Sequence, residues 1–159
     1  MSKITNFPIT VYGNKEKFSD TITRGRCRVF HTGHNRNGTY ITKEFAQKLI
    51  ESAPYTPVKG IYEAEDFSNH GKSRSEGRIY GIVPAEPNFA WEPHTDSDGQ
   101  TREYACFDVL YYTALYEEAS EIPTKGESME LYRKTLKGEW KYIEGKKAYV
   151  FSDGCFLGF

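Results

Sequence analysis

One segment of this chain has the spacing of an amphipathic helix, while most of the other ordered segments have the pattern of β-strands. In residues 42–53, Phe45 and Leu49 recur on one helical stripe, Thr42 is placed as an N-cap, and Pro54 follows the end. A parallel α/β sheet needs a crossover helix between successive strands. The scarcity of helices therefore argues against that class and favours a mostly antiparallel sheet.

The strand-type segments show alternating polarity or runs of aromatic and β-branched residues between Gly, Pro and Asn turn signals. They span residues 26–31, 57–63, 78–85, 102–112, 127–134, 139–145 and 147–159. The last three are expected to form a meander, and residues 86–101 a loop. The fold class predicted is α+β, mostly β: a small antiparallel β-barrel or curved sheet of about seven strands with surrounding helices.

The length of 159 residues suits one domain with a real core. Residues 1–25 are polar and are expected to form a weakly ordered N-terminal arm or an edge strand at 8–13, while residues 26–159 form the single domain. The apolar ending CFLGF, residues 155–159, suggests that the chain was cut from a longer polypeptide.

Composition narrows the partners and cofactors that we expect. The net charge is −1, so no global field recruits nucleic acid or an anionic membrane, and no apolar run is long enough to span a bilayer. The three cysteines are far apart and form no CxxC pair, which is typical of reduced thiols rather than of a disulfide framework or a zinc site. No cofactor is predicted.

A serine in an unusual setting raises the question of nucleophilic catalysis. In KGESMELY, strand alternation puts Ser128 and Glu130 on one face and Met129 and Leu131 on the other. A serine hydroxyl needs an adjacent base to attack a carbonyl. His70, on a polar loop just before a strand, is the candidate base, because a neutral imidazole accepts a proton near pH 7.

A third group would orient the imidazole. Asp153 is the preferred candidate, about one hairpin length downstream of Ser128, and Glu130 competes because it shares the strand face of the serine. Arg78 and Arg133 are placed to stabilise an oxyanion or bind substrate, although both are equally suited to surface ion pairs.

A metal site is the rival chemistry. The chain has four histidines, His31, His34, His70 and His94, but the first two do not share a face on a strand, and no HExxH motif occurs. No metal is therefore predicted, and a metal-dependent hydrolase remains as an alternative reading.

Three segments carry a family resemblance by their sequence and by their order along the chain: NRNGTYITKEFAQKLIESAP, PVKGIYEAEDFSNHGKSRSEGRIYGIV and SMELY. Together they resemble the tailed-phage prohead proteases, capsid-maturation serine proteases related to herpesvirus assemblin. The resemblance covers roughly residues 26–158. It implies a small β-barrel surrounded by helices, with His70 as general base and Ser128 as nucleophile. Asp153 would stand where assemblin-type enzymes have a second histidine, since no histidine follows residue 94.

The function implied is a prohead serine endopeptidase that cleaves scaffold and major capsid protein segments, and itself, by Ser-His-acid acyl transfer. It would act in the host cytoplasm, inside the assembling procapsid, and a homo-oligomer is compatible with this role. No nucleic acid or membrane partner is expected. The alternative is a catalytically inactive phage structural or binding module of the same fold, using exposed aromatic residues such as Trp91 for contacts.

Overall fold

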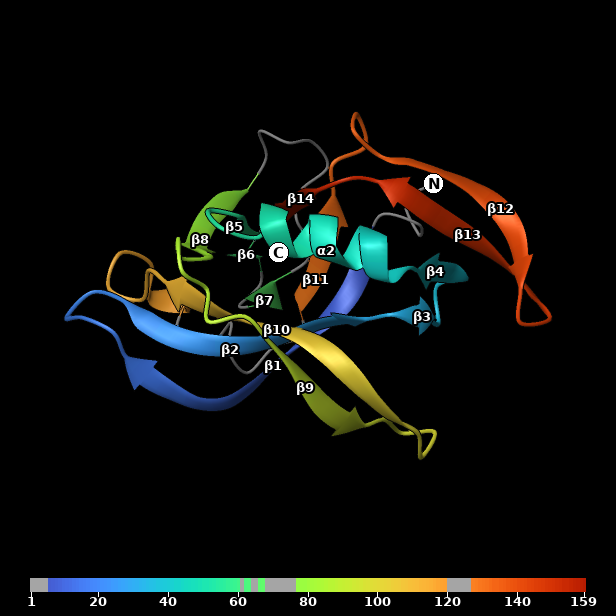
Figure 1. The fold of residues 1–159 in the computed structure, drawn as a ribbon. Coiled ribbons are helices and arrows are strands. Elements are labelled where there is room, and N and C mark those ends of the chain that lie inside the picture. The colour runs from blue at the N-terminus through green and yellow to red at the C-terminus, as the bar shows by residue number, and fades with distance from the viewer. Residues whose placement is uncertain (1–5, 61, 64–65, 68–76, 120–126) are drawn as a thin grey trace.

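A computed structural model places most of the 159 residues; it describes residues 6–60, 62–63, 66–67, 77–119 and 127–159. The strands of the largest sheet run in the order β14-β11-β1-β2-β10-β8-β5, and β9 pairs with β10 off this path (Figure 1). Their bounds are β1 (Asn6–Lys17), β2 (Thr23–His31), β5 (Pro57–Gly60), β8 (Arg78–Ile82), β9 (Ala90–Thr95), β10 (Thr101–Tyr111), β11 (Glu127–Leu131) and β14 (Phe156–Gly158). Every strand pair recorded within this sheet is antiparallel.

The two ends of this sheet come together at the last residue of the chain. The backbone N–H of Phe159 donates to the carbonyl of Pro57 over 2.9 Å, and the N–H of Lys59 donates to the carbonyl of Phe159 over 3.0 Å. These bonds join β5 to the residue that follows β14. The sheet is therefore strongly curved, and the strands at its two ends are neighbours.

The remaining strands form two smaller sheets. The second sheet runs in the order β12-β13-β4-β3, and the third contains β6 and β7. Their bounds are β3 (Gly33–His34), β4 (Thr39–Ile41), β6 (Tyr62–Glu63), β7 (Asp66–Phe67), β12 (Lys137–Ile143) and β13 (Lys146–Asp153). β13 pairs with β4 in parallel, and the β12–β13 hairpin extends to one side of the molecule (Figure 1).

The predicted helix is confirmed as α2 (Lys43–Ser52). Its N-cap is Thr42, whose hydroxyl accepts a hydrogen bond from the N–H of Phe45 over 3.1 Å. Phe45 and Leu49 are buried as expected, and Phe45 stacks on Phe151 of β13 with ring centroids 5.1 Å apart. α2 therefore anchors the second sheet to the core. No helix in the described ranges is long and apolar enough to cross a membrane.

The mostly β character of the chain is confirmed, but three local expectations were wrong. The N-terminal segment is not an edge: β1 lies between β11 and β2, paired with both. The expected meander is absent, since β12 pairs with β13 whereas β11 pairs with β1 and β14. Pairing between segments far apart in the chain decides both features, and a local pattern of polarity carries no information about it.

The expected loop at 86–101 instead contains strand β9. Pro93 argues against a strand in the sequence, because proline is rare within sheets. In the structure Pro93 lies opposite Glu103 on β9, for which β10 is the recorded partner. Proline is tolerated on such an edge strand, where its lack of an N–H need not remove a hydrogen bond between strands. The turn between β9 and β10 contains Gly99 at φ +82°.

We expect Gly81→Ala to lower the free energy of unfolding by about 1–3 kcal/mol, because a Cβ there would collide with the backbone carbonyl of Leu110 on β10. Gly158→Ala is the matched control on β14: its Cβ would lie 3.5 Å from the nearest atom, the carbonyl oxygen of Pro57. The control should stay within about 1 kcal/mol of the parent. Urea unfolding followed by circular dichroism measures both, and equal midpoints for the two variants would contradict the β8–β10 register.

Candidate functional site

The strand that carries the candidate nucleophile is β11, held by β1 on one side and β14 on the other. Ser128 lies opposite Pro8, and Glu130 lies opposite both Asn6 and Gly158. Met129 is buried, as is Leu131, which confirms the alternation read from the sequence. The side chain of Ser128 lies outside the described part of the chain.

His70 also lies outside the described residues. The chain is described up to Phe67 at the end of β7 and again from Gly77, one residue before β8. The pairing of Ser128 with His70 therefore stays a prediction.

Asp153 is placed at the end of β13, with its side chain 46% exposed. Its carboxylate accepts the N–H of Gly154 over 2.9 Å and lies 3.5 Å from the ammonium of Lys48 on α2. The Gly154 bond first, and the charge of Lys48 second, lower the pKa of Asp153. The residue thus links the end of β13 to α2.

Asp153 lies toward the far end of β11 from the serine. The N–H of Tyr132 donates to the carbonyl of Cys155, so the chain just after Asp153 meets β11 beyond Leu131. From Ser128 to Tyr132 the strand advances about 13 Å at 3.3 Å per residue. Asp153 as the third catalytic residue stays a prediction, and Glu130, on β11 itself, remains the competitor.

The two arginines singled out in the sequence have different surroundings. Arg78 donates to the carboxylate of Glu118 over 3.0 Å and lies over the ring of Tyr116, 5.1 Å from its centroid. Glu118 also accepts from the hydroxyl of Tyr80, whose pKa rises to about 12 through burial and through this bond. Arg133 is exposed, two residues after β11 ends.

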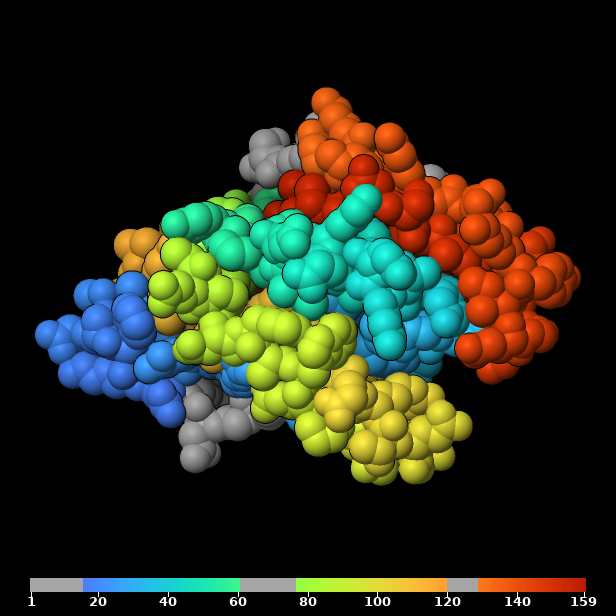
Figure 2. Space-filling view, in the orientation of Figure 1, coloured from blue at the N-terminus to red at the C-terminus, as the bar shows by residue number. Residues whose placement is uncertain are grey.

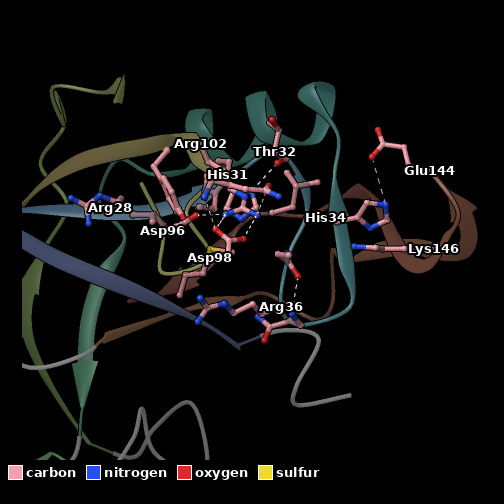
Figure 3. Close-up of a pocket in the computed structure, with 18 residues that line it drawn as sticks. Arg28, His31, Thr32, His34, Arg36, Asp96, Asp98, Arg102, Glu144 and Lys146 are labelled. Carbon is pink, nitrogen blue, oxygen red and sulfur yellow. Dashed lines mark hydrogen bonds and ion pairs between the residues drawn. The ribbon is translucent and has the colours of Figure 1, made fainter. Parts of the chain in front are cut away.

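A pocket of about 790 Å³ opens beside β11, with Met129 in its lining (Figure 3). Its walls come from the end of β2, the β3–β4 turn and the tips of the β9–β10 and β12–β13 hairpins. In Figure 2 the two hairpins flank a hollow at the right of the molecule. The sequence did not reveal this pocket, because four segments far apart in the chain build it.

Arg102 organises one wall of the pocket. Its guanidinium binds the carboxylates of Asp96 and Asp98 over 2.5 and 2.8 Å, and the hydroxyl of Tyr104 donates to Asp96 over 2.7 Å. The Arg102 bond, and next the N–H of Gln100, lower the pKa of Asp98 to about 2. Burial and the bond to Asp96 raise the pKa of Tyr104 to about 12. Both acids of this wall are therefore already paired within the protein.

Two histidines of the lining are held by backbone carbonyls. His31 donates from Nδ1 to the carbonyl of Thr32, and His34 donates from Nε2 to the carbonyl of Ile143, both over 2.8 Å. A carbonyl can only accept, so the second nitrogen of each neutral ring is left as an acceptor. Within the described ranges, no group of three or more His, Cys, Asp or Glu side chains is placed to hold a metal ion.

The lining of the pocket is polar and carries charges of both signs. Arg28, Arg36 and Lys146 also line it, Asp96 and Asp98 are paired with Arg102, and Glu144 is a third acid of the lining. Arg36 bridges two walls by donating to the hydroxyl of Ser97 over 2.7 Å.

Comparison with known proteins gives one family. A family model described as the YonD N-terminal domain matches residues 17–159. Neither the curated proteins nor the solved structures contain a match to the chain. The matched range includes β11 and every candidate catalytic residue, but only the last residue of β1, Lys17.

We expect Arg102→Ala to raise the pKa of Asp98 from about 2 toward its ordinary value of 3.8, because its strongest hydrogen-bond donor is lost. In the parent, the pairing of Asp98 with Arg102 stabilises the folded state fully at pH values above the pKa that Asp98 has in the unfolded chain. This stabilisation is lost as the pH falls through about 2, the pKa of Asp98 in the folded chain. Carboxyl-detected NMR titration measures the shift. Lys141→Ala, on the other hairpin, is the control, and an Asp98 pKa unchanged by Arg102→Ala would refute the proposed pairing.

Proposed function

This chain belongs to the YonD N-terminal domain family, and we propose that it is a serine endopeptidase of the prohead protease type. Ser128 is the proposed nucleophile and His70 the proposed general base. The substrates proposed are extended segments of scaffold and capsid proteins, including segments of its own polypeptide, cleaved inside the assembling procapsid in the host cytoplasm.

The observation that carries this proposal is the position of β11. The strand is hydrogen-bonded on both sides, by β1 and by β14, so the backbone at Ser128 belongs to a fixed element. A nucleophile whose backbone lies in a strand paired on both sides is kept in one orientation, as acyl transfer requires.

The curvature of the main sheet also supports the small β-barrel that the resemblance implies. A small barrel of the assemblin type needs its end strands to meet, and the Phe159 bonds to Pro57 and Lys59 bring β5 beside β14. Counting through this junction, β8 is separated from β11 by β5 and β14. In the sequence, the segment that carries His70 directly precedes β8.

The reaction proceeds by two acyl transfers. The imidazole of His70 takes the proton of the Ser128 hydroxyl as the oxygen attacks the peptide carbonyl, and backbone N–H groups stabilise the oxyanion. The imidazolium then protonates the leaving amine, and an acyl-enzyme remains. Water, activated by His70, releases the carboxylic acid and restores the serine. A carboxylate, Asp153 or Glu130, holds the imidazole in the correct tautomer.

We expect a fluorophosphonate probe to label the intact chain at Ser128, and Ser128→Ala to abolish that labelling. His70→Ala should slow labelling by at least about 100-fold, because the hydroxyl loses its base. Ser152→Ala, at an exposed position on β13, is the matched control and should label like the parent. Mass spectrometry of the peptide that carries the probe identifies the site.

Two outcomes would contradict the protease. Labelling that survives in Ser128→Ala would move the nucleophile elsewhere. A parent chain that is folded by circular dichroism and takes up no probe would favour a non-catalytic binding module of the same fold.

Two conservative variants distinguish Asp153 from Glu130 as the third catalytic residue. If Asp153 orients His70, Asp153→Asn should reduce the labelling rate by up to about 10⁴-fold, whereas Glu130→Gln should not. The reverse pattern would assign the role to Glu130. Lys48→Met provides the structural control, since it removes the partner that Asp153 has in the structure without altering the carboxylate.

A further inference from the structure

The β12–β13 hairpin and the turn before it are net positive in a chain that is slightly acidic. Residues 133–153 hold six basic and three acidic side chains, although the net charge of the whole chain is −1. The six basic residues, all exposed, are Arg133, Lys134, Lys137, Lys141, Lys146 and Lys147. The rest of the chain therefore carries a net negative charge, and most of this positive segment is the hairpin that extends to one side of the molecule (Figure 1).

One face of this hairpin is aromatic as well as basic. Trp140 is 55% exposed and Tyr142 is 79% exposed. Across the hairpin, Trp140 lies opposite Tyr149 and Tyr142 lies opposite Lys147. Trp140 and Tyr149 meet edge to face with ring centroids 5.4 Å apart, and the ammonium of Lys147 lies 5.5 Å from the Trp140 ring centroid. We call this surface, formed by these four side chains, the aromatic face.

Neither of the two acids within residues 137–147 lies on the aromatic face. Side chains alternate along a strand, so Glu139 is on the opposite face of β12, where it pairs with Lys141 over 3.1 Å. Glu144 is in the turn at the hairpin tip, 4.0 Å from the ring of His34. Neither acid is therefore placed to neutralise Lys147, and the aromatic face presents exposed rings together with the positive charge of this lysine.

We propose that the aromatic face binds single-stranded nucleic acid. Exposed rings on a strand stack on unpaired bases, and flexible lysines attract the phosphates without reading the sequence. A duplex hides the faces of its bases, so it offers nothing for these rings to stack on. An acidic peptide would satisfy the lysines but gives the rings no stacking partner. The proposal is independent of the proposed protease. The pocket beside β11 is lined by Lys146, which alternation places on the face of β13 opposite to Lys147.

The test is fluorescence anisotropy of a labelled oligothymidylate of about 12 nucleotides titrated with the intact chain. We expect saturable binding that weakens as salt rises. Tyr142→Ala and Trp140→Ala should each weaken binding at least about 5-fold, since each removes a stacking surface. Lys147→Ala should weaken binding and lower the slope of log K against log salt by about one.

Matched controls use side chains of the same kind elsewhere. Tyr55→Ala removes a tyrosine that is 67% exposed and lies before β5, and Lys17→Ala removes an exposed lysine of β1. Both should bind like the parent. Because Tyr142 is largely exposed, its replacement should leave the thermal midpoint unchanged, which circular dichroism verifies.

Three results would overturn the proposal. The first is absence of saturable binding by the folded parent at about 0.1 M salt. The second is equal weakening by the control variants and by the variants of the aromatic face. The third is preference for a duplex of the same length, or for phosphatidylserine vesicles, over the single strand.

Discussion

The backbone hydrogen bonds of Phe159 determine how the rest of the main sheet is arranged. By joining Pro57 and Lys59 to the residue after β14, they make the two ends of a curved sheet neighbours. β11 lies one strand from the end of this sheet, between β1 and β14, and it carries Ser128 and lines the pocket through Met129. A strand fixed on both sides can hold a reactive group in one orientation, which is why the candidate site is assigned to it.

Electrostatics organise the pocket in a way that the overall composition conceals. Arg102 pairs with Asp96 and Asp98, so two of the three acids that line the pocket are neutralised by a residue of the same hairpin. The cations that also line it come from β2, the β3–β4 turn and the tip of the β12–β13 hairpin. A chain with a net charge of −1 thus places four cations around one pocket, against three acids.

β13 separates the two surfaces to which we assign roles. Lys146 lines the pocket, whereas Lys147 lies over Trp140 on the aromatic face. Since successive side chains of a strand point to opposite faces, the same short hairpin contributes to both without the two sites sharing a residue. Substitutions can therefore alter the pocket and the aromatic face independently.

The sequence alone determined those features that depend on neighbours along the chain. Thr42 capping α2, the burial of Phe45, and the inward side chains of β11 all follow from local periodicity and hydrogen bonding. Only the tertiary structure decided that β1 is internal, that Pro93 belongs to an edge strand, and that four distant segments form a pocket. The physical reason is that a strand is stabilised by its partners, and hydrogen bonds between distant segments leave no period in the local sequence.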